Sequence, residues 1–289
     1  MIKDFQYLAP KTLKEALTLT AKYEHEAKII AGGQSLLVVM KQGFLETEKL
    51  IDIKGLSDLN YIKYDAKSGL KIGALTTHRE LEKSSVIKKN YKVISDMEDN
   101  LATIQTRNWG TIGGNICHAD PAGDPAVVFG ALGAKLKLVS SKGERVVEME
   151  SFSTDYLETI IKEGEILTEI QIPPIPAHTG VSHQKLMFQK GDMGIVGAAA
   201  LITLNPKDHK CVEARIFLSN CGAVPVRAKQ AENALKGNVI DEKALTKAAE
   251  LASNNINPPE DVHGTSAYRK PMAGVFVRRV VKAAAESAR

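Results

Sequence analysis

Apolar positions in the first fifty residues change from helical spacing to short strand-like runs. Thr12 and Glu15 have the spacing of a capping box, and the apolar positions after Thr12 recur every three or four residues. A later apolar run stops at the paired glycines Gly32 and Gly33, which is typical of a buried strand that ends in a tight turn. The pattern predicts a small α/β unit with a helix over 10–23, strands over 28–31 and 50–53, and the segment 35–41 between them.

The middle of the chain has the spacing of strands separated by one helical region. Short apolar or alternating pieces with Ser/Gly turns between them predict strands in YIKYD, LKIGAL and KLKLVS. Residues 84–106 are more helix-like, and 165–174 predict a strand that is closed by two prolines. The following PPIPAHTG (173–180) is the predicted linker.

The last third predicts a sheet followed by helices. Long apolar runs predict one strand over 185–204 and another over 211–220. Helical spacing follows over 241–253 and 271–288, with Asp241 as the expected N-cap of the first helix and Pro271 as the expected first residue of the second. The sequence contains no internal repeat and no low-complexity segment.

Composition excludes several classes of protein. The chain has 289 residues, a formal net charge of +4 and 5% aromatic residues, which does not suit a nucleic-acid-binding surface. The run 194–204 is too short for a membrane span, and the N-terminus lacks the apolar region of a signal peptide. Three cysteines without a C-x-x-C pair argue against a disulfide framework, a zinc site or an iron–sulfur cluster held by this chain alone, and we expect no metal site. These features favour a reducing cytoplasm.

The glycine-rich stretch AGGQS (31–35) has the properties of an anion-binding turn. Paired glycines allow backbone N–H groups to point into one concavity, and Gln34 and Ser35 add donors. Neither the P-loop pattern nor the Rossmann glycine pattern is present. An ordinary tight turn between strand and helix is the alternative interpretation.

A second glycine-rich stretch, GTIGGNICHADPAGDP (110–125), offers donors and carboxylates together. Hydroxyl and amide groups surround its glycines, and Asp120 and Asp124 follow. A pyrophosphate needs donors and a ribose diol needs a carboxylate, so a dinucleotide needs both. His118 beside Asp120 is a weak metal pair and fits a polar loop histidine, while Cys117 fits a small buried hydrophobic residue.

Together these motifs resemble a known family. AGGQSLL, TIGGNICHADPAGD and EILTEIQIP, followed by Lys185 and Asp192 at K-x(6)-D spacing, are similar to the FAD-binding medium subunit of the molybdenum hydroxylases. This is the family of xanthine dehydrogenase and aerobic carbon monoxide dehydrogenase, and the resemblance covers essentially the whole chain in order. It implies an α+β protein with a two-lobed α/β FAD-binding domain of the PCMH type, as in vanillyl-alcohol oxidase. The expected parts are residues 1–55 and 56–175, with FAD between them, and a C-terminal α+β domain over 180–289.

The resemblance also implies which residues hold FAD. The first motif would wrap the pyrophosphate, Thr111 and Asn115 would bind phosphate or ribityl groups, and Asp124 would bind the adenosine end or a ribose hydroxyl. Leu101 and Leu167 would pack on the rings, and Lys185 and Asp192 would lie near the isoalloxazine, where a lysine would raise the flavin potential. The full expected set is Ile29, Ile30, Ala31, Gly32, Gly33, Gln34, Ser35, Leu36, Leu101, Thr106, Gly110, Thr111, Gly113, Gly114, Asn115, Asp120, Asp124, Leu167, Lys185 and Asp192.

The family implies an electron carrier without its own catalytic acid, base or nucleophile. A large subunit would hold molybdopterin, a small subunit would hold two [2Fe–2S] clusters, and a heterotrimer would dimerise to a heterohexamer in the cytoplasm or at the inner face of the membrane. The acceptor would be quinone, NAD or oxygen, and carbon monoxide, an aldehyde and a purine or other heterocycle all stay open as substrates. Gln189 and Met193 depart from many relatives, and the chain lacks the extra cysteines of one family branch.

Two other interpretations remain open at this stage. A free-standing flavin reductase of the UDP-N-acetylenolpyruvoylglucosamine reductase type shares a similar first glycine motif, although GTIGGNICHADP fits its second motif poorly. A flavin-free assembly subunit is the other interpretation, and the intact glycine motifs argue against it.

Overall fold

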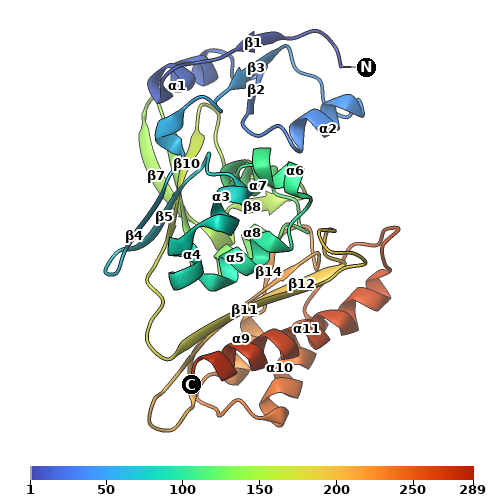
Figure 1. The fold of residues 1–289 in the computed structure, drawn as a ribbon. Coiled ribbons are helices and arrows are strands. Elements are labelled where there is room, and N and C mark those ends of the chain that lie inside the picture. Colours follow the sequence, from blue (N-terminus) through green and yellow to red (C-terminus); the bar gives the residue numbers. More distant parts are fainter. Residues whose placement is uncertain (1) are drawn as a thin grey trace.

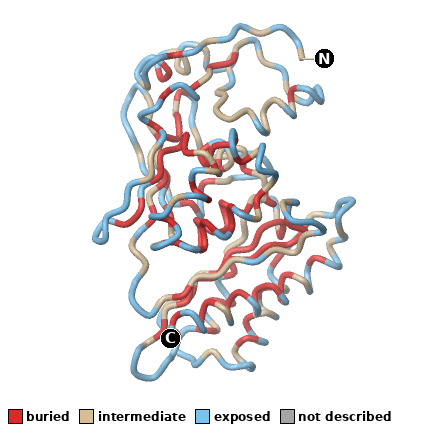
Figure 2. The backbone as a smooth tube through the Cα atoms, viewed as in Figure 1, coloured by how far each residue is buried: buried red, intermediate tan, exposed pale blue. Residues whose placement is uncertain are grey.

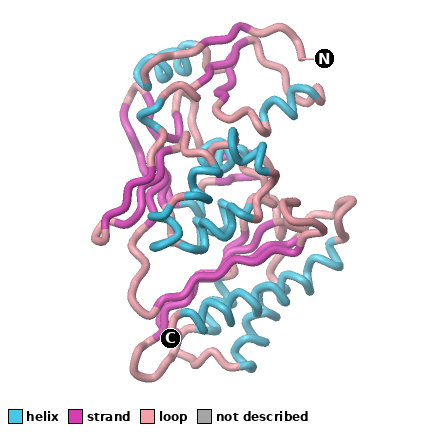
Figure 3. Tube along the Cα trace, in the orientation of Figure 1, coloured by secondary structure: helices cyan, strands magenta, loops and turns pink. Residues whose placement is uncertain are grey.

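The computed structural model describes residues 2–289, which form three successive α/β or α+β layers along the chain (Figure 1). The main sheets have three, five and four strands, and each is built from a separate part of the sequence. Helices and strands alternate down the length of the molecule (Figure 3). Among these residues, no helix combines the length and the hydrophobicity needed to cross a lipid bilayer.

The first lobe is a small parallel sheet with two helices. Its strands pair in the order β1-β3-β2, so β3 lies in the middle and buries Leu50 and Ile51. Thr12 Oγ1 accepts from the amide of Glu15, which confirms the predicted start of the first helix. The elements are β1 (Gln6–Leu8), α1 (Leu13–Lys22), β2 (Ala27–Ile30), α2 (Leu36–Lys41) and β3 (Lys49–Asp52).

The second lobe is an antiparallel sheet with a block of six short helices inserted between two of its strands. The sheet order is β4-β5-β10-β6-β7, and the helices connect β5 to β6. The strands are β4 (Ile62–Asp65), β5 (Gly69–Gly73), β6 (Lys135–Ser140), β7 (Gly143–Glu148) and β10 (Ile166–Ile172), with a small hairpin of β8 (Ser153–Asp155) and β9 (Glu158–Thr159). The helices are α3 (His78–Lys83), α4 (Ser85–Asn90), α5 (Lys92–Asp99), α6 (Ile104–Trp109), α7 (Ile112–His118) and α8 (Asp124–Ala131).

The C-terminal part is a four-stranded antiparallel sheet covered by helices. Its elements are β11 (Thr179–Leu186), β12 (Val196–Leu204), β13 (Cys211–Ser219), β14 (Val226–Arg227), α9 (Lys229–Leu235), α10 (Glu242–Asn254) and α11 (Ser266–Ser287). The prediction of Asp241 as N-cap is confirmed, because its side chain accepts from the amide of Ala244.

Two expectations for this part are wrong. Residues 185–204 do not form one strand: β11 ends at Leu186, and the chain leaves the sheet until Val196 because Gly191, at φ +95°, turns it into a loop. Pro271 does not begin a helix either. The Thr265 side chain caps α11 from the preceding turn by accepting from the amide of Tyr268, so Pro271 falls inside the helix.

The C-terminal sheet is buried on both faces, which explains the unbroken apolar run in β12. On one face it packs against α10 and α11, and on the other Ala199, Leu201 and Phe217 join the core of the second lobe. The buried backbone in Figure 2 therefore continues from α8 through β12 to α11. This packing sets β11 beside α5 and lets Lys185 of β11 reach Asp124 at the start of α8, so several predicted site residues meet here.

Candidate functional site

The first glycine motif forms the turn that leaves the carboxyl end of β2. Ile29 and Ile30 lie in β2, and Leu36 begins α2. Gly33 has φ +72°, a conformation that glycine adopts without steric cost. A Cβ atom on Gly32 would lie 2.1 Å from the carbonyl oxygen of Trp109, so the turn packs directly on the second motif.

The second glycine motif is fixed against the end of β5. Gly110 accepts a hydrogen bond from the amide of His78, and Gly113 donates to the carbonyl of Ala74. A Cβ atom on Gly113 would lie 2.6 Å from the Cβ atom of Ala74, which leaves room only for glycine. The amide of Ala74 in turn donates to the carbonyl of Thr168, which follows Leu167 in β10. The second motif is thereby connected through Ala74 to β10.

Two polar residues of the second motif form structural hydrogen bonds within the motif. Thr111 is buried and caps α7, where its Oγ1 accepts from the amide of Gly114 at 3.1 Å. Asp120 Oδ1 accepts from the amide of Ala122 at 2.8 Å and shapes the following turn. The Gly114 amide is thereby committed to Thr111, so the half-buried side chain of Asn115 is the more accessible donor of this motif.

Asp124 and Lys185 form a buried ion pair between α8 and β11. Lys185 Nζ lies 2.7 Å from Asp124 Oδ2, and both side chains are almost completely buried. His183 Nε2 lies 3.6 Å from the other oxygen, Oδ1, and neither of these two atoms has a hydrogen-bond partner. Burial alone would raise the pKa of Asp124, but His183 and Lys185 outweigh it and hold the pKa below its ordinary value.

The loop between β11 and β12 closes on the turn after α5. Gly191 forms a single parallel bridge with Leu101, and Lys190 Nζ lies 2.5 Å from Asp99 Oδ2. Asp192 is exposed, and its carboxylate accepts from the amide of Gln189 within the same loop. Leu101 is therefore held between the second lobe and the C-terminal sheet.

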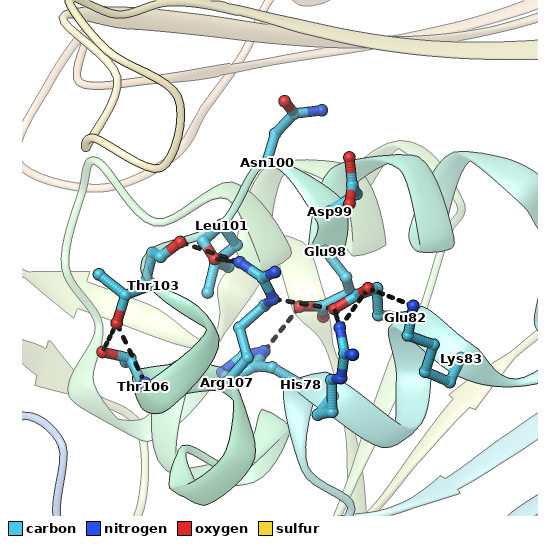
Figure 4. A network of polar contacts seen from close by, with 12 residues as sticks. His78, Glu82, Lys83, Glu98, Asp99, Asn100, Leu101, Thr103, Thr106 and Arg107 are labelled. Atoms are coloured by element: carbon cyan, nitrogen blue, oxygen red, sulfur yellow. Dashed lines mark hydrogen bonds and ion pairs between the residues drawn. The ribbon is translucent and has the colours of Figure 1, made fainter.

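A charged network supports this turn from the second lobe (Figure 4). The Arg107 guanidinium donates to the carbonyls of Leu101 and Ala102 at 2.7 and 2.9 Å, and to Glu82 at 2.9 Å. Burial of Glu82 opposes its ionisation, but bonds from Arg79, Lys83 and Arg107 lower its pKa to about 2. Thr106 lies beside this network, and its hydroxyl is 3.1 Å from the hydroxyl of Thr103.

A second buried pair lies next to the network and under the glycine motif. His78 Nδ1 is 2.9 Å from Glu98 Oε2, and a Cβ atom on Gly110 would lie 3.1 Å from the His78 ring. Burial raises the pKa of Glu98, although His78 opposes this, and the carboxylate's second oxygen has no partner. The pair packs the polar interior of the second lobe beneath Gly110.

The structure thus gathers the expected site residues into two groups. In the first, the turn 31–35 meets Trp109 and Gly110, and the Gln34 side chain lies close to Gly110. In the second, Asp124 and Lys185, which were expected to serve different parts of FAD, are paired with one another. Leu167 is buried in β10 behind the second motif.

The sequence interpretation missed several residues of this region. Trp109 supplies a carbonyl to the junction of the motifs, and Arg107 ties Leu101 to Glu82. His183 precedes Lys185 by two positions, so strand alternation places both on one face of β11. That alternation is the one signal in the sequence that could have identified His183.

Comparisons with known proteins agree with this architecture. Residues 3–175 match the family described as the FAD binding domain in molybdopterin dehydrogenase, and residues 182–284 match the CO dehydrogenase flavoprotein C-terminal domain. The carbon monoxide dehydrogenase medium chain of Afipia carboxidovorans is 35% identical over 97% of this chain and 96% of its own length.

The chain belongs to the FAD-binding medium subunits of the molybdenum hydroxylases.

Two further similarities cover almost the whole subunit. The 6-hydroxypseudooxynicotine dehydrogenase complex subunit alpha of Paenarthrobacter nicotinovorans is 33% identical over 99% of this chain and 96% of its own. A structure of reconstituted CO dehydrogenase from Oligotropha carboxidovorans aligns with a TM-score of 0.94 at 34% identity and covers 99% of both chains. The expected fold class and the cofactor FAD are confirmed, and the chain is a subunit of an oxidoreductase complex.

The residues present fit FAD. Gly32 of the first motif lies directly against the backbone of Trp109 and Gly110, so a glycine turn, whose backbone N–H groups suit an anionic pyrophosphate, meets the second lobe at one junction. The buried Oδ1 of Asp124 has no donor within the described chain, so it is free to accept from a hydroxyl or ring N–H. The individual contacts to FAD remain predictions for all twenty expected residues.

Replacing Gly32 by alanine is expected to weaken FAD binding by about tenfold or more. The new Cβ would collide with the Trp109 carbonyl and push the two motifs apart, and such overpacking costs about 1–3 kcal/mol. The measurement is the dissociation constant of FAD, determined by fluorescence quenching. Gly55→Ala is the control, because a Cβ there meets no atom within 4 Å. Equal affinities of the two variants would contradict the prediction.

The Glu82→Gln variant is expected to be less stable than the wild type at pH 7, by roughly 1.5–3 kcal/mol for bonds to charged groups. Because the folded pKa of Glu82 is about 2, its contribution is present above the unfolded pKa and is lost as the pH falls from about 4.5 toward 2. Urea unfolding at pH 7, 4 and 3 measures the difference, which should shrink with pH. Glu286→Gln on the exposed face of α11 is the control, and a difference that stays constant with pH would show that Glu82 is not the titrating group.

Proposed function

We propose that the chain is the electron-transfer subunit of a molybdenum-containing hydroxylase or dehydrogenase. It takes electrons from [2Fe–2S] clusters of a small partner subunit and passes them to an external acceptor, namely quinone, NAD or oxygen. The observation that carries the proposal is the contact of the two glycine motifs at Gly32 and Trp109. That contact makes one cofactor site from two lobes, and the family supplies FAD as its occupant.

Bound FAD supplies the chemistry of a carrier, since it exchanges electrons singly or in pairs. The residues of the chain hold and tune it. The turn 31–35 offers backbone donors, Asn115 adds a side-chain amide, and Asp124 offers a carboxylate oxygen. Leu101 and the loop that follows β11 cover the site from the C-terminal side.

Substrate chemistry belongs in this proposal to a large molybdenum subunit. Two relatives with 35% and 33% identity along nearly their whole length are named for substrates as different as carbon monoxide and 6-hydroxypseudooxynicotine. A conserved carrier that serves different substrates accounts for this, because the substrate then meets another chain. The expected assembly is a heterotrimer of large, medium and small subunits that dimerises.

The direct test is purification of the chain from its native cell with its bound partners. We expect flavin absorbance near 450 nm in a complex that also contains molybdenum, iron and two further polypeptides. FAD without metals or partners would instead favour a free-standing flavoenzyme. A colourless complex would favour a flavin-free assembly role.

The Lys185→Met variant is expected to lower the midpoint potential of the bound FAD. An ammonium near the flavin favours the reduced, anionic form, so its removal makes reduction harder. The single variant also leaves the Asp124 carboxylate without its ion-pair partner, which lowers the potential for a second reason. Spectroelectrochemical titration of the FAD-loaded complex gives the potential.

The double variant Lys185→Met/Asp124→Asn separates the two causes because it removes both members of the pair. If the ammonium itself tunes the flavin, the double variant keeps part of the decrease. A double variant with the wild-type potential would assign the whole effect to the unpaired carboxylate, and an unchanged potential in both variants would remove Lys185 from the flavin's surroundings.

A further inference from the structure

The buried polar atoms without a hydrogen-bond partner gather at one interface, which we call the seam: the contact of the C-terminal sheet with α5 and α8. Within residues 2–289 these atoms are Glu98 Oε1, Asp124 Oδ1, His183 Nε2 and Ser219 Oγ. Such atoms are rare in folded proteins because each one costs desolvation free energy without a compensating bond. Their location therefore indicates a place where another group or another protonation state completes the structure.

All four atoms lie where β11 and its sheet meet α5 and α8. Asp124 and His183 face one another across the seam. Ser219 is on the same sheet face as Lys185: the position of a Cβ atom on Gly197, between them, is 2.3 Å from Ser219 Oγ and 3.5 Å from Lys185 Cβ. Glu98, on α5, is close enough for the charge of Asp124 to contribute to the rise in its pKa.

The charged and titratable side chains around His183 are arranged in pairs. Asp124 on α8 pairs with Lys185, and Glu98 on α5 pairs with His78 on α3. β12 carries no charged side chain, and Arg215 on β13 pairs with its neighbour Glu213. The opposite face of β11 is covered by α11 at Gly180. The Lys185 ammonium thus compensates the charge of the Asp124 carboxylate through Oδ2, and Asp124 Oδ1 is left facing His183 Nε2.

We propose that His183 is a positioning residue of the FAD site that serves as the alternative, proton-carrying partner of Asp124. When both of its ring nitrogens carry a proton, His183 donates from Nε2 to Asp124 Oδ1. The Asp124 carboxylate then remains paired while the Lys185 ammonium turns toward bound FAD. The inference rests on the proposed function, because it requires FAD beside Lys185.

The physical reason is the cost of leaving a buried charge alone. Removing one partner of a buried ion pair is strongly unfavourable, so Lys185 can leave Asp124 only if another cation replaces it. Histidine is the side chain that ordinarily gains a proton between pH 5 and 8. A proton on His183 Nε2, which lies 3.6 Å from Asp124 Oδ1, lets these two unpartnered atoms serve each other, and a second proton on the ring supplies the charge that replaces the ammonium.

This arrangement couples FAD binding to uptake of one proton from solvent, without any electron transfer. Binding is then strongest at low pH, and the dissociation constant rises with pH by up to about tenfold per unit once His183 must be protonated for binding. The test uses the full chain with the subunits that co-purify with it, after FAD has been removed. Calorimetric titration with FAD, in buffers of different ionisation enthalpy between pH 6 and 8, counts the protons.

The matched variants are His183→Gln and His25→Gln. Glutamine can still donate to Asp124 but cannot gain a charge, so proton uptake and the pH dependence should both disappear in His183→Gln. His25 is exposed in the first lobe, and His25→Gln should keep the wild-type pH dependence. If His183→Gln does not fold, proton counting in the wild type still tests the inference, because FAD binding without proton uptake overturns it.

Failure of the inference about His183 and failure of the proposed function would give different results. FAD binding to the wild type without proton uptake would overturn the role of His183 while leaving the proposed function intact. Proton uptake that persists in His183→Gln would also overturn it, because the proton would then bind another group, such as the His78–Glu98 pair. Absence of FAD binding at every pH would reject the proposed function and this inference together.

Discussion

The close approach of Gly32 to the Trp109 carbonyl is the contact on which the proposed cofactor site depends. The first lobe contributes a turn at the end of a parallel strand, and the second lobe contributes a turn fixed to the end of β5. Neither turn makes a site alone. Their backbones meet because Gly32 lacks a side chain that would collide with Trp109 and Gly110, while Gly113 lacks one that would collide with Ala74 behind the second turn. The glycines therefore specify an arrangement between lobes as well as a local conformation.

A second constraint comes from the C-terminal sheet, which carries residues to the same region from far along the chain. Its register places His183 and Lys185 on the face toward α5 and α8. Arg107 and Glu82 hold the turn at Leu101 against which the loop after β11 rests. Buried ionic groups thus occur on both sides of the junction between the second lobe and the C-terminal sheet. Arg107 and Glu82 pair within the second lobe, and Asp124 and Lys185 pair across the junction.

The sequence predicted the features that depend on local signals. The helix after Thr12, the strand before the glycine pair, the N-cap at Asp241 and the two glycine motifs all follow from neighbouring residues. The prediction that Pro271 begins the helix was wrong because the helix begins earlier, where the Thr265 side chain caps it. The pairing of Asp124 with Lys185 joins residues 61 positions apart, so only the packing of α8 against the sheet reveals it. The individual contacts to FAD stay predictions because they depend on an atom-level fit that no motif contains.

The alanines of β12 have a mechanical consequence. Ala198, Ala199 and Ala200 are completely buried between the second lobe and the helices α10 and α11. Methyl groups fill both faces there, so the strand acts as a spacer of fixed thickness between two rigid layers. A larger side chain in place of Ala199 would push the sheet away from the second lobe, together with the end of β11 that carries Lys185. The position of Lys185 relative to the second lobe is thereby set in part by methyl groups of the neighbouring strand.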